Sequence, residues 1–267
     1  MPLVFAAVMP HGGALVPGVD DDSEHSSTEL TAAMHEIGRS AASARLDALI
    51  IADPHGIGLD GAHSVTMASR MAGTLGLNSL EASIDIALAE TLLSETDERI
   101  IPAVGVTAEA GAALPMEWGT FVPAWFLSQA DALASIVVIC PTRSRGLHSC
   151  VALGEAIADL AEASEKRIGF IASADNAHAH QENGPYGYHP SAKIFDRSVV
   201  ELTKANDFEA YLDFDQTLMD EALPDSPWQL AILTGIFRVV PFKTRVVTYD
   251  CPSYFGMMVA GFDRIEA

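Results

Sequence analysis

The stretch Leu49-Ile50-Ile51-Ala52-Asp53-Pro54-His55-Gly56 joins a short apolar run to a polar turn. A short apolar run that ends at turn-forming residues is typical of a strand buried within a sheet. The same arrangement occurs near the start of the chain, where the apolar run 4–8 leads into Pro10-His11-Gly12. Both stretches therefore predict a buried strand followed by a loop that carries a histidine.

Apolar runs of this kind alternate along the chain with longer segments of helical composition. Ser26 and Glu29 fit a capping box at the start of the first such helix. Alternation of strands and helices predicts an α/β fold with a central, mostly parallel or mixed sheet flanked by helices, and we expect a single domain over residues 1–267. Further strands are predicted at 136–139, 168–172 and 245–248, and helices at 26–44, 84–93, 151–163, 191–205 and 228–237.

The acidic composition excludes several kinds of partner. Asp and Glu number 36 and Lys and Arg number 15, which gives a formal net charge of -21. A field of this sign repels nucleic acids and anionic membrane surfaces. No apolar run reaches the ~18 residues of a membrane helix. The three cysteines are widely spaced and predict neither a disulfide framework nor a zinc ribbon. We therefore expect a cytoplasmic protein that binds neither nucleic acid nor membrane.

His11 and His55 stand in matching contexts among the histidines of the chain. Each follows a proline and precedes a glycine at the end of a predicted buried strand. Proline restricts the approach of the chain, and glycine lets a ligand or metal come close to the backbone. In open α/β sheets ligands bind at the carboxyl ends of the strands, and imidazole is a common ligand for iron, zinc and copper. The pair therefore indicates a metal site at this edge of the sheet.

A carboxylate is the expected third ligand of such a site. Two histidines and one carboxylate, with three positions left open, form the facial triad of non-haem Fe(II) oxygenases. The acidic segment 220–229 supplies the candidates, and within it Asp225 precedes Ser226-Pro227 where a helix should begin. An aspartate at that position is equally well explained as an ordinary helix N-cap. The residues alone leave the two roles of Asp225 open.

The segment 173–189 is rich in histidine, glycine and tyrosine. Its aromatic residues predict the wall or lid of a pocket, with a polar surface loop as the alternative. His178 and His180 are two residues apart and would point the same way on an extended chain. One of them is a candidate base, because imidazole titrates near neutral pH. Trp118, beside Glu117, marks a second predicted pocket edge or else a turn packed on the core.

Four motifs in order resemble the class III extradiol ring-cleaving dioxygenases, whose type member is the β subunit of protocatechuate 4,5-dioxygenase. The resemblance covers almost the whole chain. It implies a non-haem Fe(II) dioxygenase of aromatic compound catabolism, which opens a catechol-, aminophenol- or gallate-type ring with O₂. The motifs are Pro10-His11-Gly12, Asp53-Pro54-His55, Ile171-Ala172-Ser173 leading to His178 and His180, and Glu221-Ala222-Leu223-Pro224-Asp225.

Carried over by position, the resemblance implies that His11 and His55 are iron ligands. The third ligand in the family is normally Glu, and the matching position here is Asp225, with Glu221 as the alternative. An aspartate reaches about one bond less far than a glutamate, so the backbone must lie closer to the metal.

The resemblance also implies the catalytic histidines, and the predicted pocket walls supply the candidates for substrate binding. His178 takes the place of the acid–base histidine, with His180 nearby. Trp118, Tyr186 and Tyr188 are the predicted substrate-binding residues. Family members often have His-Gly where this chain has Trp118-Gly119, which leaves the identity of the substrate open.

Two other functions remain compatible with the same residues. Proteins of the Memo group share the fold and act as non-catalytic binding scaffolds, and a zinc hydrolase would use the same histidine pair with a metal-bound water. The expected partners of the dioxygenase are a small aromatic diol and O₂. We expect a homo-oligomer, with a homodimer as the default, and some family members also carry a small α subunit.

Overall fold

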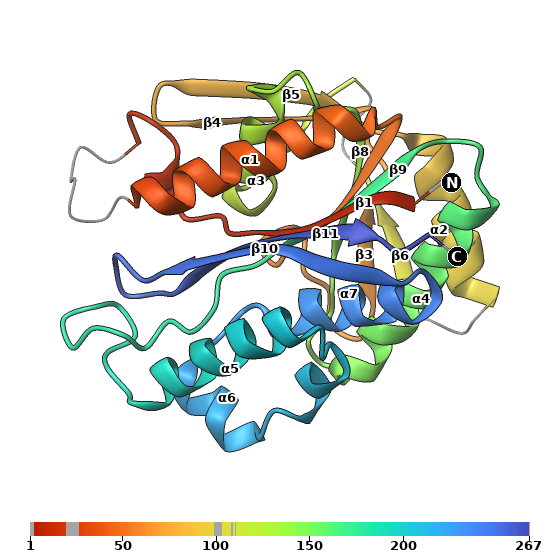
Figure 1. Ribbon diagram of the computed structural model, residues 1–267. Helices are drawn as coiled ribbons and strands as arrows, with labels where there is room; N and C mark the ends of the chain where they lie inside the picture. The colour runs from red at the N-terminus through yellow and green to blue at the C-terminus, as the bar shows by residue number, and fades with distance from the viewer. Residues whose placement is uncertain (1–2, 20–26, 99–102, 108, 110, 267) are drawn as a thin grey trace.

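Four parallel strands form the centre of the main sheet in a computed structural model of the chain (Figure 1). They are β1 (Leu3–Met9), β9 (Ile168–Ser173), β2 (Ala48–Ala52) and β8 (Ser135–Cys140), in that spatial order. Antiparallel strands β11 (Met257–Arg264) and β10 (Phe242–Asp250) extend the sheet beyond β1, and β3 (His63–Thr66) and β6 (Ala103–Val106) extend it beyond β8. The structure describes residues 3–19, 27–98, 103–107, 109 and 111–266.

The strands form where they do because both of their faces are buried. In β1, Ala6 and Val8 point into one apolar core and Ala7 and Met9 into the other, as the two-residue period of a strand requires. One core contains residues of α1 (Thr28–Ala44) and α3 (Trp118–Ser128). The other contains residues of α2 (Ile86–Glu98), α4 (Gly146–Ala163), α5 (Ser191–Ala205) and α7 (Pro227–Val239).

Helices α4 and α7 pack closely against each other. The two helices meet at Gly154 and Gly235, where an added Cβ would collide with the backbone carbonyls of Ile232 and Val151. Pro227 occupies the first turn of α7, where its missing N–H costs no hydrogen bond. The residues just before α7 are thereby held at the edge of the sheet where β1, β2 and β9 end.

The predicted fold class is confirmed: a central mixed sheet is flanked by helices on both faces. Each strand and helix predicted from the sequence corresponds to an element of that type; the ends of α5 agree, and the others are shifted at one end or both. The first helix begins at Thr28 and is capped by Ser27, whose side chain accepts from the N–H of Leu30. The predicted cap, Ser26, lies outside the described residues.

Several elements were not predicted. The segment 115–123 is predicted to be a pocket edge or a turn, but from Trp118 onward it belongs to helix α3, with Pro123 inside it. Almost every residue of α3 is buried, so the segment has no polar face to produce a helical period. The other unpredicted elements are β3, β6 and β11, a small second sheet of β4 (Arg70–Leu75), β5 (Asn78–Ser83) and β7 (Leu114–Pro115), and α6 (Gln216–Ala222).

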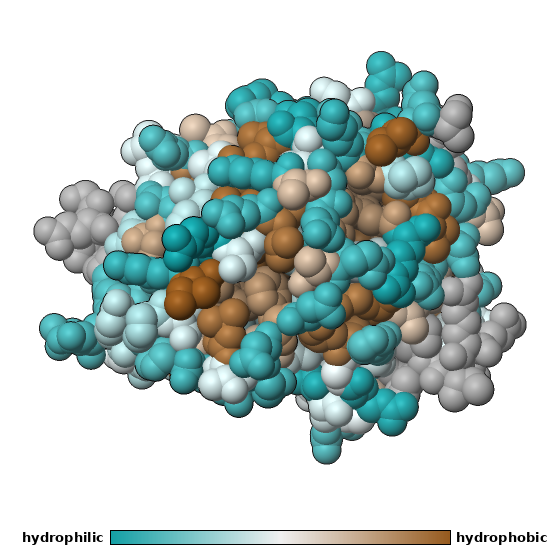
Figure 2. Space-filling model, turned by 60° about the horizontal axis from the view of Figure 1, so that its bottom comes forward, coloured by the Kyte–Doolittle hydropathy of each residue, from teal (hydrophilic) through white to brown (hydrophobic). Residues whose placement is uncertain are grey.

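One face of the molecule combines polar and apolar surface. Figure 2 shows a largely hydrophilic face on which apolar side chains gather toward the middle. No helix among the described residues is long and apolar enough to cross a membrane.

Candidate metal centre

The loops that follow β1 and β2 meet the segment before α7 at one edge of the sheet. Nε2 of His11 lies 3.1 Å from Nε2 of His55 and 3.2 Å from Oδ2 of Asp225. The distance from Nε2 of His55 to the same carboxylate oxygen is 3.6 Å. His11 and Asp225 are buried, and the His55 side chain is about one-third exposed. The structure therefore brings together the three residues that the sequence singled out.

The three donor atoms fit a single metal ion. A circle through atoms separated by 3.1, 3.2 and 3.6 Å has a radius of about 1.9 Å, slightly less than a ~2.1 Å metal–ligand bond. One ion can therefore bond to all three atoms from just outside their plane. Oδ2 of Asp225 is also buried without a hydrogen bond among the described residues, as a carboxylate oxygen reserved for a cation would be.

Ser173, the last residue of β9, fixes the tautomer of His11. The hydroxyl of Ser173 donates to the carbonyl of Gly119 at 2.5 Å. Its single proton is thereby used, so its oxygen must accept from Nδ1–H of His11 at 3.0 Å. When the ring is neutral, Nε2 of His11 then has a free lone pair directed at His55 and Asp225. An outer hydrogen bond of this kind is the usual way of orienting a metal-binding histidine.

Asp53 explains why an aspartate precedes Pro54-His55. This fully buried carboxylate accepts from the N–H of His55 at 2.8 Å and from the hydroxyl of Thr120 at 2.5 Å. A Cβ at Gly119 would collide with Oδ1 of Asp53, so the start of α3 must approach through a glycine. Asp53 thus fixes the turn that carries His55 and joins it to α3.

Asp225 does not cap α7. The N-cap residue is Ser226, and no side chain bonds to the first amides of the helix. Oδ1 of Asp225 instead accepts from the N–H of Asp175 at 2.9 Å, which leaves Oδ2 facing the two imidazoles. This geometry favours the ligand role over the cap role.

Asp175 is a site residue that the sequence reasoning did not single out. Its Oδ1 accepts from the N–H of His11 at 3.1 Å, and its Oδ2 lies 3.3 Å from Nε2 of the same residue. Burial raises the pKa of Asp175, and the charge of Asp225 raises it further. For Asp225, the attraction of His11 and the other histidines outweighs burial and holds the pKa well below its usual range. Within this pair, Asp225 is therefore the more readily ionised carboxylate.

His11 is held as a cation in the absence of metal. Burial alone lowers its pKa, but the charges of Asp175 and Asp225 outweigh burial and raise the pKa from 6.5 to about 9. A positive charge stabilises two imidazoles and a carboxylate that lie this close together. A proton supplies that charge when no metal ion is bound.

Glu221, the alternative third ligand, lies away from this group. Its carboxylate accepts from the hydroxyl of Ser191 at 2.6 Å and lies 3.5 Å from Nδ1 of His189. Of the two predicted carboxylates, Asp225 is the one beside His11 and His55.

His178 is oriented for proton exchange at Nε2. Nδ1 lies 3.0 Å from the carbonyl oxygen of Leu223, which cannot donate, so Nδ1 carries the proton. The ring stacks on Phe255 with centroids 5.4 Å apart and meets Tyr186 edge-on at 5.5 Å. Nε2 therefore has the free lone pair.

His180 does not accompany His178 into the site, which corrects the expectation that the two rings point the same way. Nε2 of His180 donates to Oδ2 of Asp196 at 2.7 Å, and the ring borders a different cavity. Residues 178–180 do not form a regular strand, and the period of two does not hold there.

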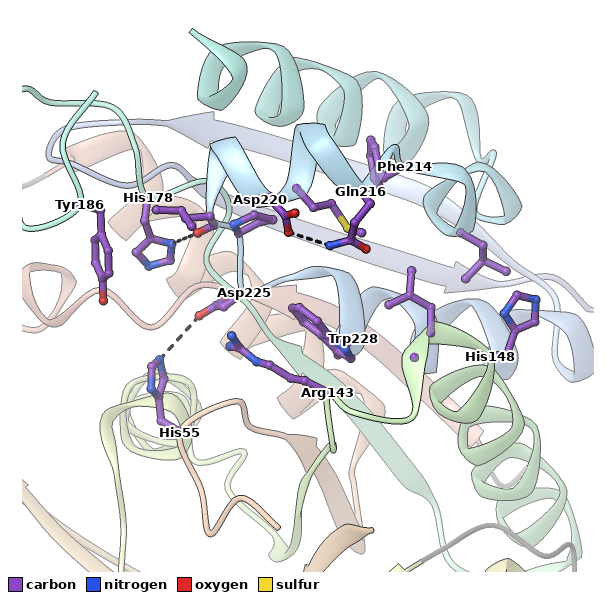
Figure 3. A pocket seen from close by; sticks show the side chains of 16 residues that line it. His55, Arg143, His148, His178, Tyr186, Phe214, Gln216, Asp220, Asp225 and Trp228 are labelled. Atoms are coloured by element: carbon purple, nitrogen blue, oxygen red, sulfur yellow. Dashed lines mark hydrogen bonds and ion pairs between the residues drawn. The ribbon is translucent and has the colours of Figure 1, made fainter. Parts of the chain in front are cut away.

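Two cavities adjoin the metal centre and share His55, His178 and Tyr186. The first, of about 620 Å³, includes Asp225 and is drawn in Figure 3. The second, of about 420 Å³, includes His11, Asp175, Trp118 and Phe255. Of the predicted substrate-binding residues, Trp118 and Tyr186 therefore border the site. Tyr188 pairs with His180 and borders neither cavity.

Arg143 and Trp228 are further residues of the first cavity that the sequence reasoning missed. The guanidinium of Arg143 lies 4.6 Å from the centre of the Trp228 ring. Figure 3 shows the two side chains together beside Asp225. Arg143 follows β8 at the same edge of the sheet as His11 and His55. Its position just after a buried strand is the sequence feature that could have predicted its place in the cavity.

The sheet edge and its side chains define an α/β protein with a two-histidine, one-carboxylate cluster able to hold one metal ion. Residues 5–260 match the family described as the catalytic LigB subunit of aromatic ring-opening dioxygenase. The chain belongs to this family, and the predicted relationship to the class III extradiol dioxygenases is confirmed.

Individual relatives are more distant. The chain is 23% identical over 252 residues to Protein CA_C1420 of Clostridium acetobutylicum. The match covers 91% of this chain but 54% of the relative, so the chain spans about half the length of that protein. Among solved structures it is similar to uncharacterized protein JW3007 of Escherichia coli K12, with a TM-score of 0.65 and 17% identity over 97% of this chain and 99% of that one. This last likeness supports the fold alone.

Proposed function

We propose that the chain is a non-haem Fe(II)-dependent extradiol dioxygenase and that residues 1–267 act as one catalytic domain. Its substrate is a catechol-, aminophenol- or gallate-type ring, and its second substrate is O₂. The observation that carries the proposal is the convergence of His11, His55 and Asp225 on one point at the border of two cavities. Family membership supports the same reaction class.

In this proposal His11, His55 and Asp225 hold the iron. Bound there, Fe(II) would bring the diol and O₂ into contact and let electrons pass from the ring of the diol to O₂. Three protein ligands on one side leave the opposite side open for both reactants. Ser173 and Asp53 keep the two imidazoles in place, and Asp175 holds the carboxylate of Asp225 through its N–H.

His178 moves the proton. Its Nε2 accepts a proton from a substrate hydroxyl, which makes the ring more electron-rich, and later returns it. The carbonyl of Leu223 holds the proton on Nδ1 and stabilises the imidazolium that forms in between. Trp118 and Tyr186 supply aromatic walls for the ring of the substrate. His180 and Tyr188 take no direct part.

The test is anaerobic reconstitution with Fe(II), followed by addition of O₂ to mixtures with catechol, 2-aminophenol or gallate. We expect about one iron per chain, O₂ consumption with at least one ring compound, and a yellow ring-opened product. His55→Ala should lose both iron and O₂ consumption, and Glu221→Gln should keep both.

Two other outcomes would reject the dioxygenase. Zinc bound in place of iron, with hydrolysis that needs no O₂, would select the zinc hydrolase. Failure to bind any divalent metal at micromolar concentration would select a binding scaffold like the Memo group. The homo-oligomer remains a prediction, which light scattering of the purified protein tests directly.

A further inference from the structure

A buried carboxylate outside the metal centre, Asp196 on α5, is bonded to the segment that carries His178. Oδ1 accepts from the N–H of Ala177 at 2.9 Å. Oδ2 accepts from Nε2–H of His180 at 2.7 Å and from the hydroxyl of Tyr249 at 2.6 Å. The Asp196 side chain is only 2% exposed. An ionised carboxylate only accepts hydrogen bonds, and these three donors satisfy both of its oxygens.

The three donors come from two separate segments. Ala177 and His180 flank His178 in the loop after β9, and Tyr249 lies near the end of β10. Asp196 therefore ties that loop to both a helix and a strand. His178 itself forms hydrogen bonds elsewhere. Its backbone N–H donates to the carbonyl of Ala222, and Nδ1 of its ring donates to the carbonyl of Leu223. The cluster fixes the backbone on either side of the histidine and leaves its Nε2 free.

Gly256 joins the same cluster to the aromatic wall of the site. Its N–H donates to the carbonyl of Ala177 at 3.0 Å, and its carbonyl accepts from the N–H of Asn176 at 2.8 Å. An added Cβ at this position would collide with Oδ2 of Asp196, so the approach requires glycine. The preceding residue, Phe255, stacks on His178. The cluster thus holds both the histidine and the ring packed against it.

We propose that Asp196, together with His180 and Tyr249, is a positioning residue that holds Nε2 of His178 toward the metal centre. The inference rests on the proposed function, in which His178 exchanges the substrate proton. In this inference His180 helps to hold the loop through its hydrogen bond to Asp196. Nε2 of His180 is engaged by Asp196, and the ring borders a separate cavity of about 700 Å³ instead of the two beside the metal centre.

The first experiment measures proton transfer without turnover. The full-length protein, loaded with Fe(II) under argon, is titrated with 4-nitrocatechol, whose visible absorbance reports its own ionisation. Displacement of His178 disfavours transfer of the probe's proton. Asp196→Asn should therefore raise the pH at which the bound probe loses its second proton by about one unit, a roughly tenfold change in the equilibrium. Iron content should stay at the wild-type level.

Two further variants calibrate this result. Tyr249→Phe removes a single donor and should give a smaller shift in the same direction. Glu201→Gln is the matched control, because Glu201 is an exposed carboxylate on the same helix that borders the same 700 Å³ cavity. It should give no shift. An Asp196→Asn protein that binds iron and ionises the probe like the wild type would overturn the proposal.

A double-mutant cycle with His178→Gln separates positioning from a general loss of structure. If Asp196 acts through His178, the double variant should match His178→Gln alone, both in probe ionisation and in kcat with the best ring substrate. Asp196→Asn by itself should lower kcat about tenfold with KM changed less than about threefold. Should Asp196→Asn fail to fold, Tyr249→Phe enters the same cycle.

The possible failures are distinguishable. Additive losses in the double variant would overturn the positioning role of Asp196 and leave the proposed function intact. A His178→Gln protein with wild-type probe ionisation and turnover would remove the proposed acid–base residue, and this inference with it.

Discussion

Asp225 and Asp196 are both buried aspartates, but their surroundings differ in one decisive respect. Asp196 has hydrogen-bond donors on both carboxylate oxygens, from Ala177, His180 and Tyr249. Asp225 has a donor on Oδ1 alone, and its Oδ2 faces the Nε2 atoms of two histidines.

The difference shows what each region is built to hold. A carboxylate whose two oxygens both accept hydrogen bonds ties chain segments together. A carboxylate with one oxygen left beside two imidazoles is suited to a cation. Burial and charge alone do not distinguish Asp225 from Asp196. The hydrogen-bond donors around each carboxylate distinguish them.

Exchanging each aspartate for asparagine should separate the two roles, and here we expect the largest effect. Asp225→Asn should weaken Fe(II) binding at least about 100-fold, because the only charged ligand is lost, and abolish O₂ consumption. Asp196→Asn should keep the iron but lower the free energy of unfolding by roughly 2–3 kcal/mol, because it breaks charge-assisted hydrogen bonds. Metal analysis and urea unfolding measure the two quantities.

Glu221→Gln serves as the control for both. It removes a nearby carboxylate that contacts Ser191 and should change neither quantity appreciably. If Glu221→Gln lost iron and Asp225→Asn retained it, the third ligand would be Glu221. The contrast between Asp225 and Asp196 as metal ligand and structural carboxylate would then be wrong.

The second prediction concerns pH and applies to the metal-free protein. The pKa of His11 is raised from 6.5 to about 9 in the folded state. The resulting stability is complete below pH 6.5 and is lost as the pH rises through 9. The difference is worth at most about 3 kcal/mol. Urea unfolding with a chelator present should show this loss in the wild type and in Asp196→Asn.

His11→Gln is the variant that should remove the pH dependence between 6.5 and 9. Loading with metal should also reduce it, because the ion replaces the proton between the imidazoles and Asp225. A metal-free wild type whose stability does not fall over this range would mean that His11 carries no extra proton.

Sequence patterns predicted the parts of the site that depend on local structure. His11 and His55 each follow a short buried strand, and the strands proved parallel, so their carboxyl ends meet at one edge. The family resemblance added Asp225, which lies close to both imidazoles. These predictions needed only the direction of the strands and the order of the motifs.

The remaining parts depend on contacts between distant segments. Asp175 and Asp196 look like ordinary polar residues in sequence, and their surroundings are set by other segments of the chain. His180 was misplaced for the same reason, because its partner Asp196 lies on a separate helix. Helix α3 was missed because it is apolar on nearly all sides.

The third prediction tests how the histidine half of the metal centre is held. Ser173→Ala removes the acceptor for Nδ1–H of His11, so the ring loses its fixed tautomer. We expect Fe(II) affinity to fall about tenfold, the lower end of the effect of such outer hydrogen bonds. Ser253→Ala is the control, since that buried hydroxyl borders the second cavity and has no hydrogen-bond partner among the described residues. Equal losses from both variants would assign the effect to packing.

The smallest predicted effect asks whether the first cavity contributes a charge of its own. Arg143 forms no ion pair with the described residues and faces the cavity beside Asp225. Its guanidinium suits a carboxylate on the ring substrate. Because Arg143 is exposed, we expect Arg143→Gln to raise KM for 3,4-dihydroxybenzoate by only about fivefold and to leave that for catechol unchanged. Arg145→Gln, two residues away and outside the cavity, should change neither KM. Equal changes for both compounds would mean that Arg143 supports Trp228 and does not recognise an anion.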